Sequence, residues 1–325
     1  KTPAVVLTSG NMSDEPLITG DSEAREQLRD VADAIVSYNR EIHNRADDSV
    51  IRVIDSKISI IRRSRGFVPR PVDLGINVDG ILALGAEQKN SFCIGKESQA
   101  VMSQYIGDLK NMPTCDFYKE AIGRFSELFR FEPNHIACDL HPDYLSTLHA
   151  MALGSELNIP VVKVQHHHAH IVSCMAEHGL DDTVIGISLD GTGFGTDGNT
   201  WGGEFLVSGS RSFMRYTHFD YIPMPGGDRV VDEPWRMAFS YLFTYFGETI
   251  DYDSIPVFRT VGEEKLGLVK EMLKKKINSP LSSGAGRLFD AVSALIGLCV
   301  NSSFDSEAPM RLESVLKAET EQLYS

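Results

Sequence analysis

The chain has 325 residues, of which 42% are hydrophobic and 23% charged, a composition typical of globular proteins rather than disordered or fibrous ones. This length favours two domains or one large α/β domain, because a single core stops growing near about 250–300 residues. The net charge of −14 argues against binding to a nucleic acid backbone as the main activity. We expect neither a signal peptide nor a membrane span. The five cysteines form no CxxC pair, which fits a reducing cytoplasm and predicts neither a disulfide framework nor a zinc knuckle.

Alternating strand and helix patterns predict an α/β fold with mixed sheets. In the first part we expect a strand over Ala4–Leu7, a helix over Glu23–Asn39 and a hairpin formed by Ser49–Ile54 and Ile58–Arg62. Residues 66–75 contain two prolines and are the predicted linker. We therefore place a domain boundary between residues 76 and 77.

The rest of the chain continues the alternation without a recognisable repeat. The elements expected there are a strand–turn–strand over 81–94, helices over about 95–108 and 114–130, a strand over 135–140, a helix over 144–157, a strand over 161–165, a helix from 166, a strand from 184 that ends in a glycine loop, a strand over 201–209 and a helix from 286.

The strongest local signal is the run of histidines after the strand at 161–165. If this run begins a helix, His166 and His170 lie one turn apart on one face and can share a metal ion. Asp190, at the expected end of the next strand, is a candidate third ligand, because parallel neighbours bring their carboxyl ends together. Two histidines and a carboxylate suit iron and zinc about equally. His167 would point elsewhere and be available to substrate. The alternative is a polar helix start without a metal.

Glycine clusters indicate anion sites, because glycine lets backbone N–H groups approach phosphate oxygens. Gly191 and Gly193 follow Asp190, and Gly203 lies in the next strand. The spacing fits neither the Walker A nor the GxGxxG motif, and a simple tight turn is the alternative. Lys89, in the turn between the strands of 81–94, could neutralise an anion, although most exposed lysines on such turns have no specific role.

The first part of the chain supplies hydroxyl, amide and guanidinium donors that suit a triphosphate or carbonyl-phosphate ligand: Ser9, Asn11, Arg45 and Arg62. A solvated charge run on a hairpin is the alternative for the arginines. In the helix that starts near Gly286, Asp290 could bind a pair of ribose hydroxyls, or it could serve only as a partner of the helix dipole.

Several motifs occur in one known order. TSGNMSDEPL, HNRADDSV and IIRRSRGFVP resemble the later half of a YrdC-like domain. GAEQKN, DLHPDYLST, VQHHHAH, LDGTGFGTDGNTWGGE, MPGGDRVVDEPWRMA and GRLFDAVSALIG resemble a TsaD-like domain of the actin/hsp70-type ATPase fold. This order is similar to that of the HypF family. By this resemblance, residues 1–76 are the C-terminal part of a YrdC-like domain and residues 77–325 a TsaD-like domain truncated at its C-terminus. The family's acylphosphatase-like domain and CxxC zinc fingers have no counterpart here, so we expect the sequence to be part of a longer protein.

The resemblance implies a cytoplasmic carbamoyltransferase of [NiFe]-hydrogenase maturation. Such enzymes form carbamoyl-adenylate from ATP, with Mg, and carbamoyl phosphate, and transfer the carbamoyl group to the C-terminal cysteine of HypE. The resemblance then implies roles for the candidate residues: His166, His170 and Asp190 for a metal that binds the adenylate, Ser9, Asn11, Arg45 and Arg62 for ATP and carbamoyl phosphate, Gly286 and Asp290 for the nucleoside, and Lys89 for the carbamoyl carbonyl.

Other functions remain open. O-carbamoyltransferases acting on a small-molecule hydroxyl use the same intermediate but carry the two domains in the reverse order. Synthesis of threonylcarbamoyl-adenosine on tRNA predicts a basic face, which the acidic composition after residue 75 disfavours. A metal-binding scaffold without enzymatic activity is the non-catalytic alternative.

Overall fold

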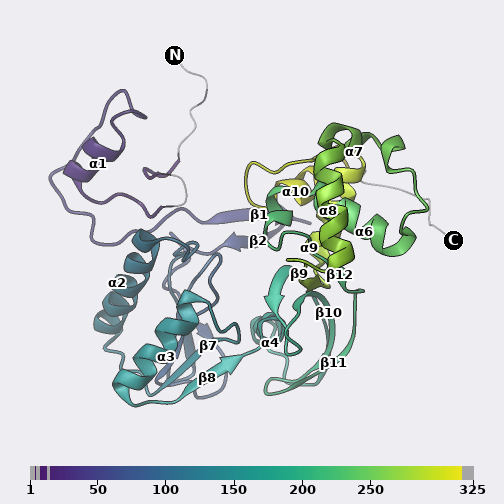
Figure 1. Cartoon of the computed structure of the whole chain (residues 1–325). Coiled ribbons are helices and arrows are strands. Elements are labelled where there is room, and N and C mark those ends of the chain that lie inside the picture. Colours follow the sequence, from purple (N-terminus) through teal and green to yellow (C-terminus); the bar gives the residue numbers. More distant parts are fainter. Residues whose placement is uncertain (1–3, 5–7, 13–14, 317–325) are drawn as a thin grey trace. The chain divides into compact units, whose positions relative to one another are not determined.

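The computed structural model describes residues 4, 8–12 and 15–316, which form two compact units, residues 1–164 and 165–325. Figure 1 traces the chain through both units. The predicted strand Ala4–Leu7 lies almost entirely outside the described residues. The predicted α/β class is confirmed, since both units combine helices with sheets.

The first unit begins with helix α1 (Asp21–Gln27) and a hairpin of β1 (Val50–Ile54) and β2 (Lys57–Arg62). The predicted helix over Glu23–Asn39 is wrong in length, because the helix ends at Gln27. It buries no residue, and Val36 is 97% exposed, so no packing surface stabilises a longer helix. The hairpin prediction is confirmed, with Asp55 and Ser56 at φ 49° and 63° in the turn.

The described part of the first unit also contains a six-stranded mixed sheet in the order β3-β6-β5-β4-β7-β8. Its strands are β3 (Val72–Asp73), β4 (Ile81–Ala83), β5 (Cys93–Lys96), β6 (Gln99–Met102), β7 (His135–Asp139) and β8 (Val161–Val164). Strands β4, β7 and β8 are parallel, and the other pairs are antiparallel. Helices α2 (Met112–Phe129) and α3 (Leu145–Leu157) pack with this sheet around one core that includes Leu82, Ile94 and Ile136.

One further prediction for this unit is wrong. The helix expected over about 95–108 is the β5–β6 hairpin and the loop after it, because Glu97 adopts φ 54° and reverses the chain. Strand β3 lies inside the predicted linker and pairs with β6, so this stretch belongs to the sheet. The helices and strands expected between residues 114 and 165 are confirmed.

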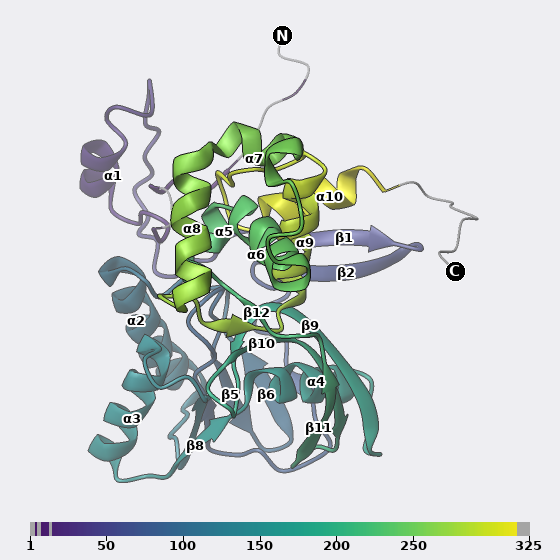
Figure 2. The ribbon, with the colours of Figure 1, turned by 45° about the vertical axis from the view of Figure 1, so that its right-hand side comes forward.

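The second unit is built on three antiparallel strands, with β10 (Thr200–Ser208) between β9 (Val184–Phe194) and β11 (Phe213–His218). The short strands β12 (Ile222–Pro223) and β13 (Leu281–Ser282) extend this sheet. Helix α4 (His166–Glu177) packs on β9 and β10 (Figure 2). The expected glycine loop after Asp190 is wrong in its start, since Gly191 and Gly193 lie inside β9, where Gly193 and Phe194 pair with β10 and the register shifts between Leu189 and Gly193.

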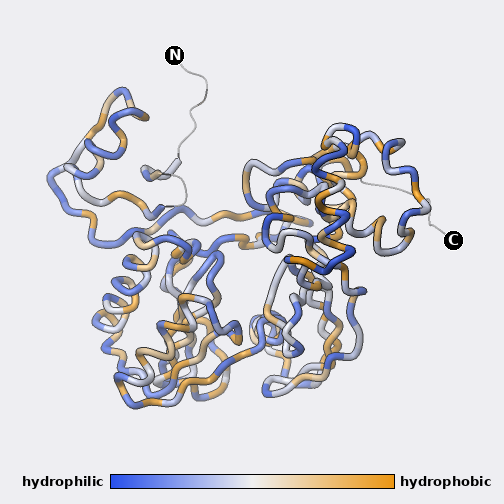
Figure 3. Tube along the Cα trace, viewed as in Figure 1, coloured by the Kyte–Doolittle hydropathy of each residue, from blue (hydrophilic) through white to orange (hydrophobic). Residues whose placement is uncertain are grey.

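The remaining helices of the second unit form a bundle around a core that includes Trp235, Phe239 and Phe258. They are α5 (Arg229–Asp232), α6 (Trp235–Phe246), the 3-10 helix η1 (Tyr252–Ser254), α7 (Pro256–Val261), α8 (Glu263–Lys275), α9 (Ala285–Leu295) and α10 (Glu307–Ser314). Hydrophobic residues are interspersed with hydrophilic ones along these helices (Figure 3). No helix in the described ranges is long and apolar enough to cross a membrane.

Candidate functional site

The histidine run lies at the start of α4. Gln165 caps this helix, because its side chain accepts a hydrogen bond of 2.9 Å from the backbone N–H of His168. The helix therefore begins at His166 and places His170 one turn further on the same face, as predicted. The Nε2 atoms of His166 and His170 lie 3.2 Å apart, and they lie 3.2 and 3.4 Å from Oδ2 of Asp190.

These separations fit one metal ion. Ligand atoms about 2.1 Å from a common ion are about 3.0 Å apart at right angles and about 3.4 Å apart in a tetrahedron. The three observed distances, 3.2, 3.2 and 3.4 Å, lie between these two values. Three such ligands leave further positions open, and the donor set suits zinc or iron.

Asp190 lies beside the histidines for a different structural reason than the one predicted. It lies inside β9, which pairs antiparallel with β10, whereas β8 belongs to the sheet of the other unit. The argument from neighbouring parallel strand ends is therefore wrong, and the packing of α4 on β9 brings the residues together. Burial raises the pKa of Asp190, but hydrogen bonds from His166 and His170 outweigh it and hold the pKa well below its usual range. Its carboxylate is therefore anionic.

His167 points into the protein interior instead of toward a surface open to substrate. Its side chain is fully buried, and burial, with the nearby His166, lowers its pKa to about 4. The side chain of Gln165 lies 3.1 Å from Nδ1, while the buried Nε2 has no hydrogen-bond partner within the described ranges. The ring packs against Gly193, where an added Cβ would lie 2.5 Å from Cε1. His167 thus carries an unpaired polar atom, Nε2, in the interior beside the candidate metal ligands His166, His170 and Asp190.

The candidate nucleoside residues lie on α9. Its N-cap is Gly284, so Asp290 lies beyond the first turn, where the helix dipole has little effect. Asp290 is 3% exposed, and burial raises its pKa to about 6 although the guanidinium of Arg287, 3.0 Å away, acts in the opposite direction. Gly286 packs against Gly191, since a Cβ on Gly286 would lie 2.8 Å from the Cα of Gly191. The structure therefore places the start of α9 directly against the strand that carries Asp190.

Sequence reasoning missed several residues of this site. Arg287 could have been found from its i, i+3 spacing to Asp290. Gln165 could have been found as a polar residue directly before a helix. Glu204 follows two glycines in a strand and is fully buried, yet nothing local in the sequence shows that it has partners.

The candidate residues of the first unit are held by local partners. Arg62 lies 3.3 Å from Asp47 and over the ring of Tyr105, and Arg45 lies over the ring of Phe117. The side chain of Asn11 donates to the carbonyls of Met12 and Glu15. Within the described ranges, no hydrogen bond or ion pair joins Ser9 or Asn11 to Arg45 or Arg62. The backbone N–H of Lys89 donates to Asp108 over 2.7 Å.

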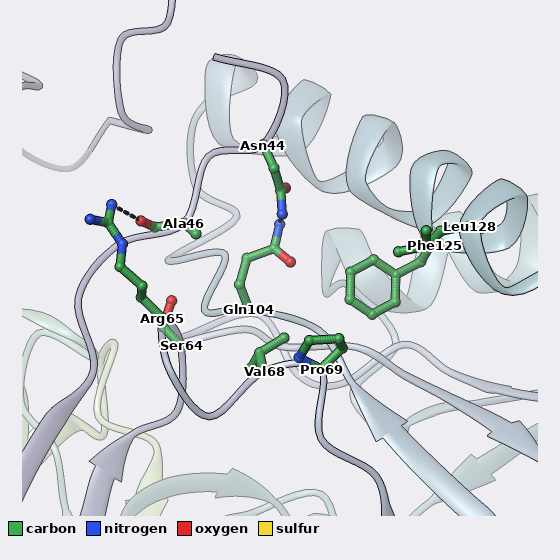
Figure 4. Close-up of a pocket in the computed structure, with 9 residues that line it drawn as sticks. All are labelled: Asn44, Ala46, Ser64, Arg65, Val68, Pro69, Gln104, Phe125 and Leu128. Atoms are coloured by element: carbon green, nitrogen blue, oxygen red, sulfur yellow. Dashed lines mark hydrogen bonds between the residues drawn. The ribbon is translucent and has the colours of Figure 1, made fainter.

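A cavity of about 150 Å³ in the first unit is lined by Asn44 and Ala46, the two sequence neighbours of Arg45 (Figure 4). Its polar wall holds two buried oxygens, Oγ of Ser64 and Oε1 of Gln104, which have no partner within the described ranges. The amide of Gln104 donates to Oδ1 of Asn44 over 3.2 Å. The lining residues are Asn44, Ala46, Ser64, Arg65, Val68, Pro69, Gln104, Phe125 and Leu128. Unpaired buried oxygens call for a hydrogen-bonding occupant, so the cavity suits a small polar molecule or water.

Comparison with known proteins decides the family. Family models match residues 1–64 (Telomere recombination), residues 77–177 (HypF Kae1-like domain) and residues 186–325 (Carbamoyltransferase, Kae1-like Domain, second subdomain). Carbamoyltransferase HypF2 of Cupriavidus necator is 41% identical over 322 residues, which are 98% of this chain and 39% of the relative. The chain belongs to the HypF family. The family predicted from the motifs is confirmed.

Other HypF proteins give the same result. Probable carbamoyltransferase HypF of Methanocaldococcus jannaschii is 38% identical over 314 residues, covering 96% of this chain and 41% of the relative. The crystal structure of full-length HypF in its phosphate- and nucleotide-bound form matches with a TM-score of 0.89 and 44% identity, over 98% of this chain and 49% of that one. HypF of T. kodakarensis matches with a TM-score of 0.89 and 40% identity, over 95% of this chain and 42% of that one. The chain thus spans about two fifths of the length of the curated relatives it matches.

Proposed function

We propose that this protein is a cytoplasmic carbamoyltransferase of [NiFe]-hydrogenase maturation. It forms carbamoyl-adenylate from carbamoyl phosphate, water and ATP, with release of pyrophosphate and phosphate, and transfers the carbamoyl group to the thiolate of the C-terminal cysteine of HypE, with AMP as the leaving group. The observation that carries the proposal is the convergence of His166, His170 and Asp190 on one point in a chain of the HypF family. Residues 1–76 are the end of a YrdC-like domain and residues 77–325 a TsaD-like domain, which the limits of the family models support.

The second unit binds the adenylate for transfer. His166, His170 and Asp190 hold an iron or zinc ion, which acts as a Lewis acid toward oxygen when bound. Asp190 supplies an anionic ligand atom, Oδ2, which lies 3.2 and 3.4 Å from the Nε2 atoms of His166 and His170. Asp290 and Gly286 bind the nucleoside, and Gly191 and Gly193 let the backbone come close to its phosphate. The N–H of Gly203 is bonded to Glu204, so this glycine supports the site through packing alone. His167 keeps its Nε2 available as a buried donor beside these groups.

The first unit contributes to adenylate formation. Arg45 and Arg62 carry fixed positive charges that suit the phosphates of ATP–Mg and of carbamoyl phosphate, and Ser9 and Asn11 supply neutral donors. The adjoining cavity supports the use of a small polar substrate, because Ser64 and Gln104 present unpaired oxygens to it. Lys89 stabilises negative charge that develops on the carbamoyl oxygen.

The test is pyrophosphate release from ATP by the full-length gene product. We expect release to require carbamoyl phosphate and to fall at least about tenfold in Arg62→Ala, since a charged partner of the phosphates is lost. Asp190→Ala is the matched variant for the transfer step. It should keep pyrophosphate release and lose transfer of ¹⁴C-carbamoyl to HypE.

The other outcomes assign other functions. Release that needs threonine and bicarbonate indicates tRNA modification, and transfer to a small-molecule hydroxyl instead of HypE indicates an O-carbamoyltransferase. No release with any substrate leaves the scaffold alternative. Transfer to HypE at an unchanged rate in Asp190→Ala contradicts the metal assignment.

A further inference from the structure

Glu204 is a buried carboxylate that binds four donors at once. Its Oε1 accepts hydrogen bonds from the backbone N–H groups of Gly202 and Gly203, at 3.1 and 3.3 Å, and from the hydroxyl of Ser283, at 2.5 Å. Its Oε2 accepts from Nε of Arg215 at 2.6 Å. The side chain has no exposed surface, so removal of any one donor leaves a buried charge that is less fully compensated.

These bonds join three backbone segments, of which one is far from the other two in the sequence. Gly202 and Gly203 belong to β10, Arg215 to β11, and Ser283 to the turn that leads into α9. Ser283 is separated from Glu204 by 79 positions. One carboxylate oxygen of Glu204 thus binds both β10 and the turn, in addition to the backbone hydrogen bond of 3.0 Å from the N–H of Ser283 to the carbonyl of Thr200.

The two joined segments lie directly against the strand of the metal ligand. A Cβ on Gly202 would lie 2.6 Å from the carbonyl oxygen of Asp190, and a Cβ on Gly284 would lie 2.6 Å from the carbonyl oxygen of Gly191. Backbone atoms of Gly202 and Gly284 are therefore in contact with Asp190–Gly191, with no side chain between them to absorb a shift. A displacement of β10 or of the turn must move this part of β9.

Arg215 is itself fixed in place, so the ion pair is rigid. Its guanidinium lies 3.8 Å from the centre of the Trp201 ring and donates to the hydroxyl of Tyr221 at 2.8 Å. Asp197 accepts from Arg215, Tyr221 and Trp201. This network anchors Glu204 from the β11 side.

We propose that Glu204 is a positioning residue for the metal site, which holds the backbone of Asp190 at the distance from His166 and His170 that binding requires. The inference rests on the metal-binding part of the proposed function. Glu204 touches no ligand atom and acts through Gly202 and the turn at Ser283–Gly284.

The experiment is a Co²⁺ titration of the whole 325-residue chain, followed by the visible absorption of the bound ion. Glu204→Gln keeps the shape of the side chain but places an amide N–H₂ against Arg215 or against the backbone N–H groups. We expect its Kd for Co²⁺ to rise at least about tenfold, the lower end for residues that orient metal ligands, and its absorption bands to shift. Ser283→Ala removes only the bond to the turn, and its Kd should rise several-fold.

Glu307→Gln is the matched control. Glu307 is also buried, and it accepts hydrogen bonds from both the backbone N–H and the hydroxyl of Ser303 and pairs with Arg311. Neither partner belongs to β9 or β10. The Glu307→Gln variant should lose thermal stability but keep the Kd for Co²⁺ and the absorption spectrum of the parent chain. An equal loss of affinity in Glu307→Gln, or an unchanged Kd in folded Glu204→Gln, overturns the proposal. Should Glu204→Gln not fold, an unchanged Kd in Ser283→Ala overturns it.

Failure of the proposed function gives a different result. If the parent chain binds no Co²⁺, or if His170→Ala binds it as tightly as the parent chain does, the metal site itself is refuted and the role of Glu204 with it. If the parent chain binds Co²⁺ through His170 and Glu204→Gln binds it equally well, only the positioning role is refuted.

Discussion

At the residue scale, Asp290 makes stability depend on pH in an unusual direction. Burial raises its pKa to about 6, above the 3.8 of an exposed aspartate, and the ion pair with Arg287 offsets this only in part. Between about pH 4 and 6 the native state therefore holds a proton that the unfolded chain has lost, so stability falls as pH rises through this window. The deficit at pH 7 is on the order of 1–3 kcal/mol.

We expect Asp290→Asn to remove this contribution. The Tm of the variant minus the Tm of the parent chain, measured by calorimetry, should rise from pH 4 to 6 and then stay constant. Asp197→Asn provides a control of opposite sign. Although burial raises the pKa of Asp197, its hydrogen bonds, that from Tyr221 foremost, lower it to about 2, so its contribution is lost as pH falls below about 4. A flat difference for Asp290→Asn between pH 4 and 6 would contradict the burial argument.

At the element scale, the contact of α9 with β9 depends on Gly286. Gly286→Ala places a Cβ 2.8 Å from the Cα of Gly191, and since the neighbour is backbone, the two elements must separate. We expect a loss of about 1–3 kcal/mol, the usual cost of overpacking, measured by urea unfolding of the chain.

The control is a glycine in another helix. Gly267 lies in α8, and an added Cβ there has no heavy atom within 4 Å. Gly267→Ala should therefore stabilise the chain by about 0.5–1 kcal/mol, the usual gain of alanine over glycine inside a helix. Equal effects of the two substitutions would exclude tight packing as the reason for Gly286.

The elements that could be predicted from the sequence are those fixed by local signals. The start of α4 follows from a polar cap and the start of α9 from a glycine, and the spacing of His166 and His170 is a property of any helix. The length of α1 and the β5–β6 hairpin were missed because a packing surface and a sheet neighbour decide them. The link from Glu204 to Ser283 cannot be found from local patterns at all, because no periodicity connects positions 79 residues apart.

At the scale of the whole molecule, the burial that stabilises the chain is divided among separate clusters. One core, with Leu84 and Phe92 among its members, lies within the first unit, and two others, around Phe239 and around Trp201, lie within the second. Each unit thus has its own source of hydrophobic stabilisation. The candidate metal ligands lie entirely in the second unit, so they are brought together by the packing of that unit alone.

Charge at this scale distinguishes the proposed function from tRNA modification. The chain carries a net charge of −14, and its most basic segment is partly neutralised locally, since Arg62 pairs with Asp47 at 3.3 Å and Arg65 with Asp48 at 3.7 Å. Counterion release from a nucleic acid needs unpaired cations, so we expect a Kd for labelled tRNA weaker than about 100 μM at 150 mM salt, measured by fluorescence anisotropy. A Kd below about 1 μM that weakens steeply with salt, and that Arg62→Gln with Arg65→Gln abolishes, would make this hairpin a phosphate-binding face and favour a tRNA substrate over HypE.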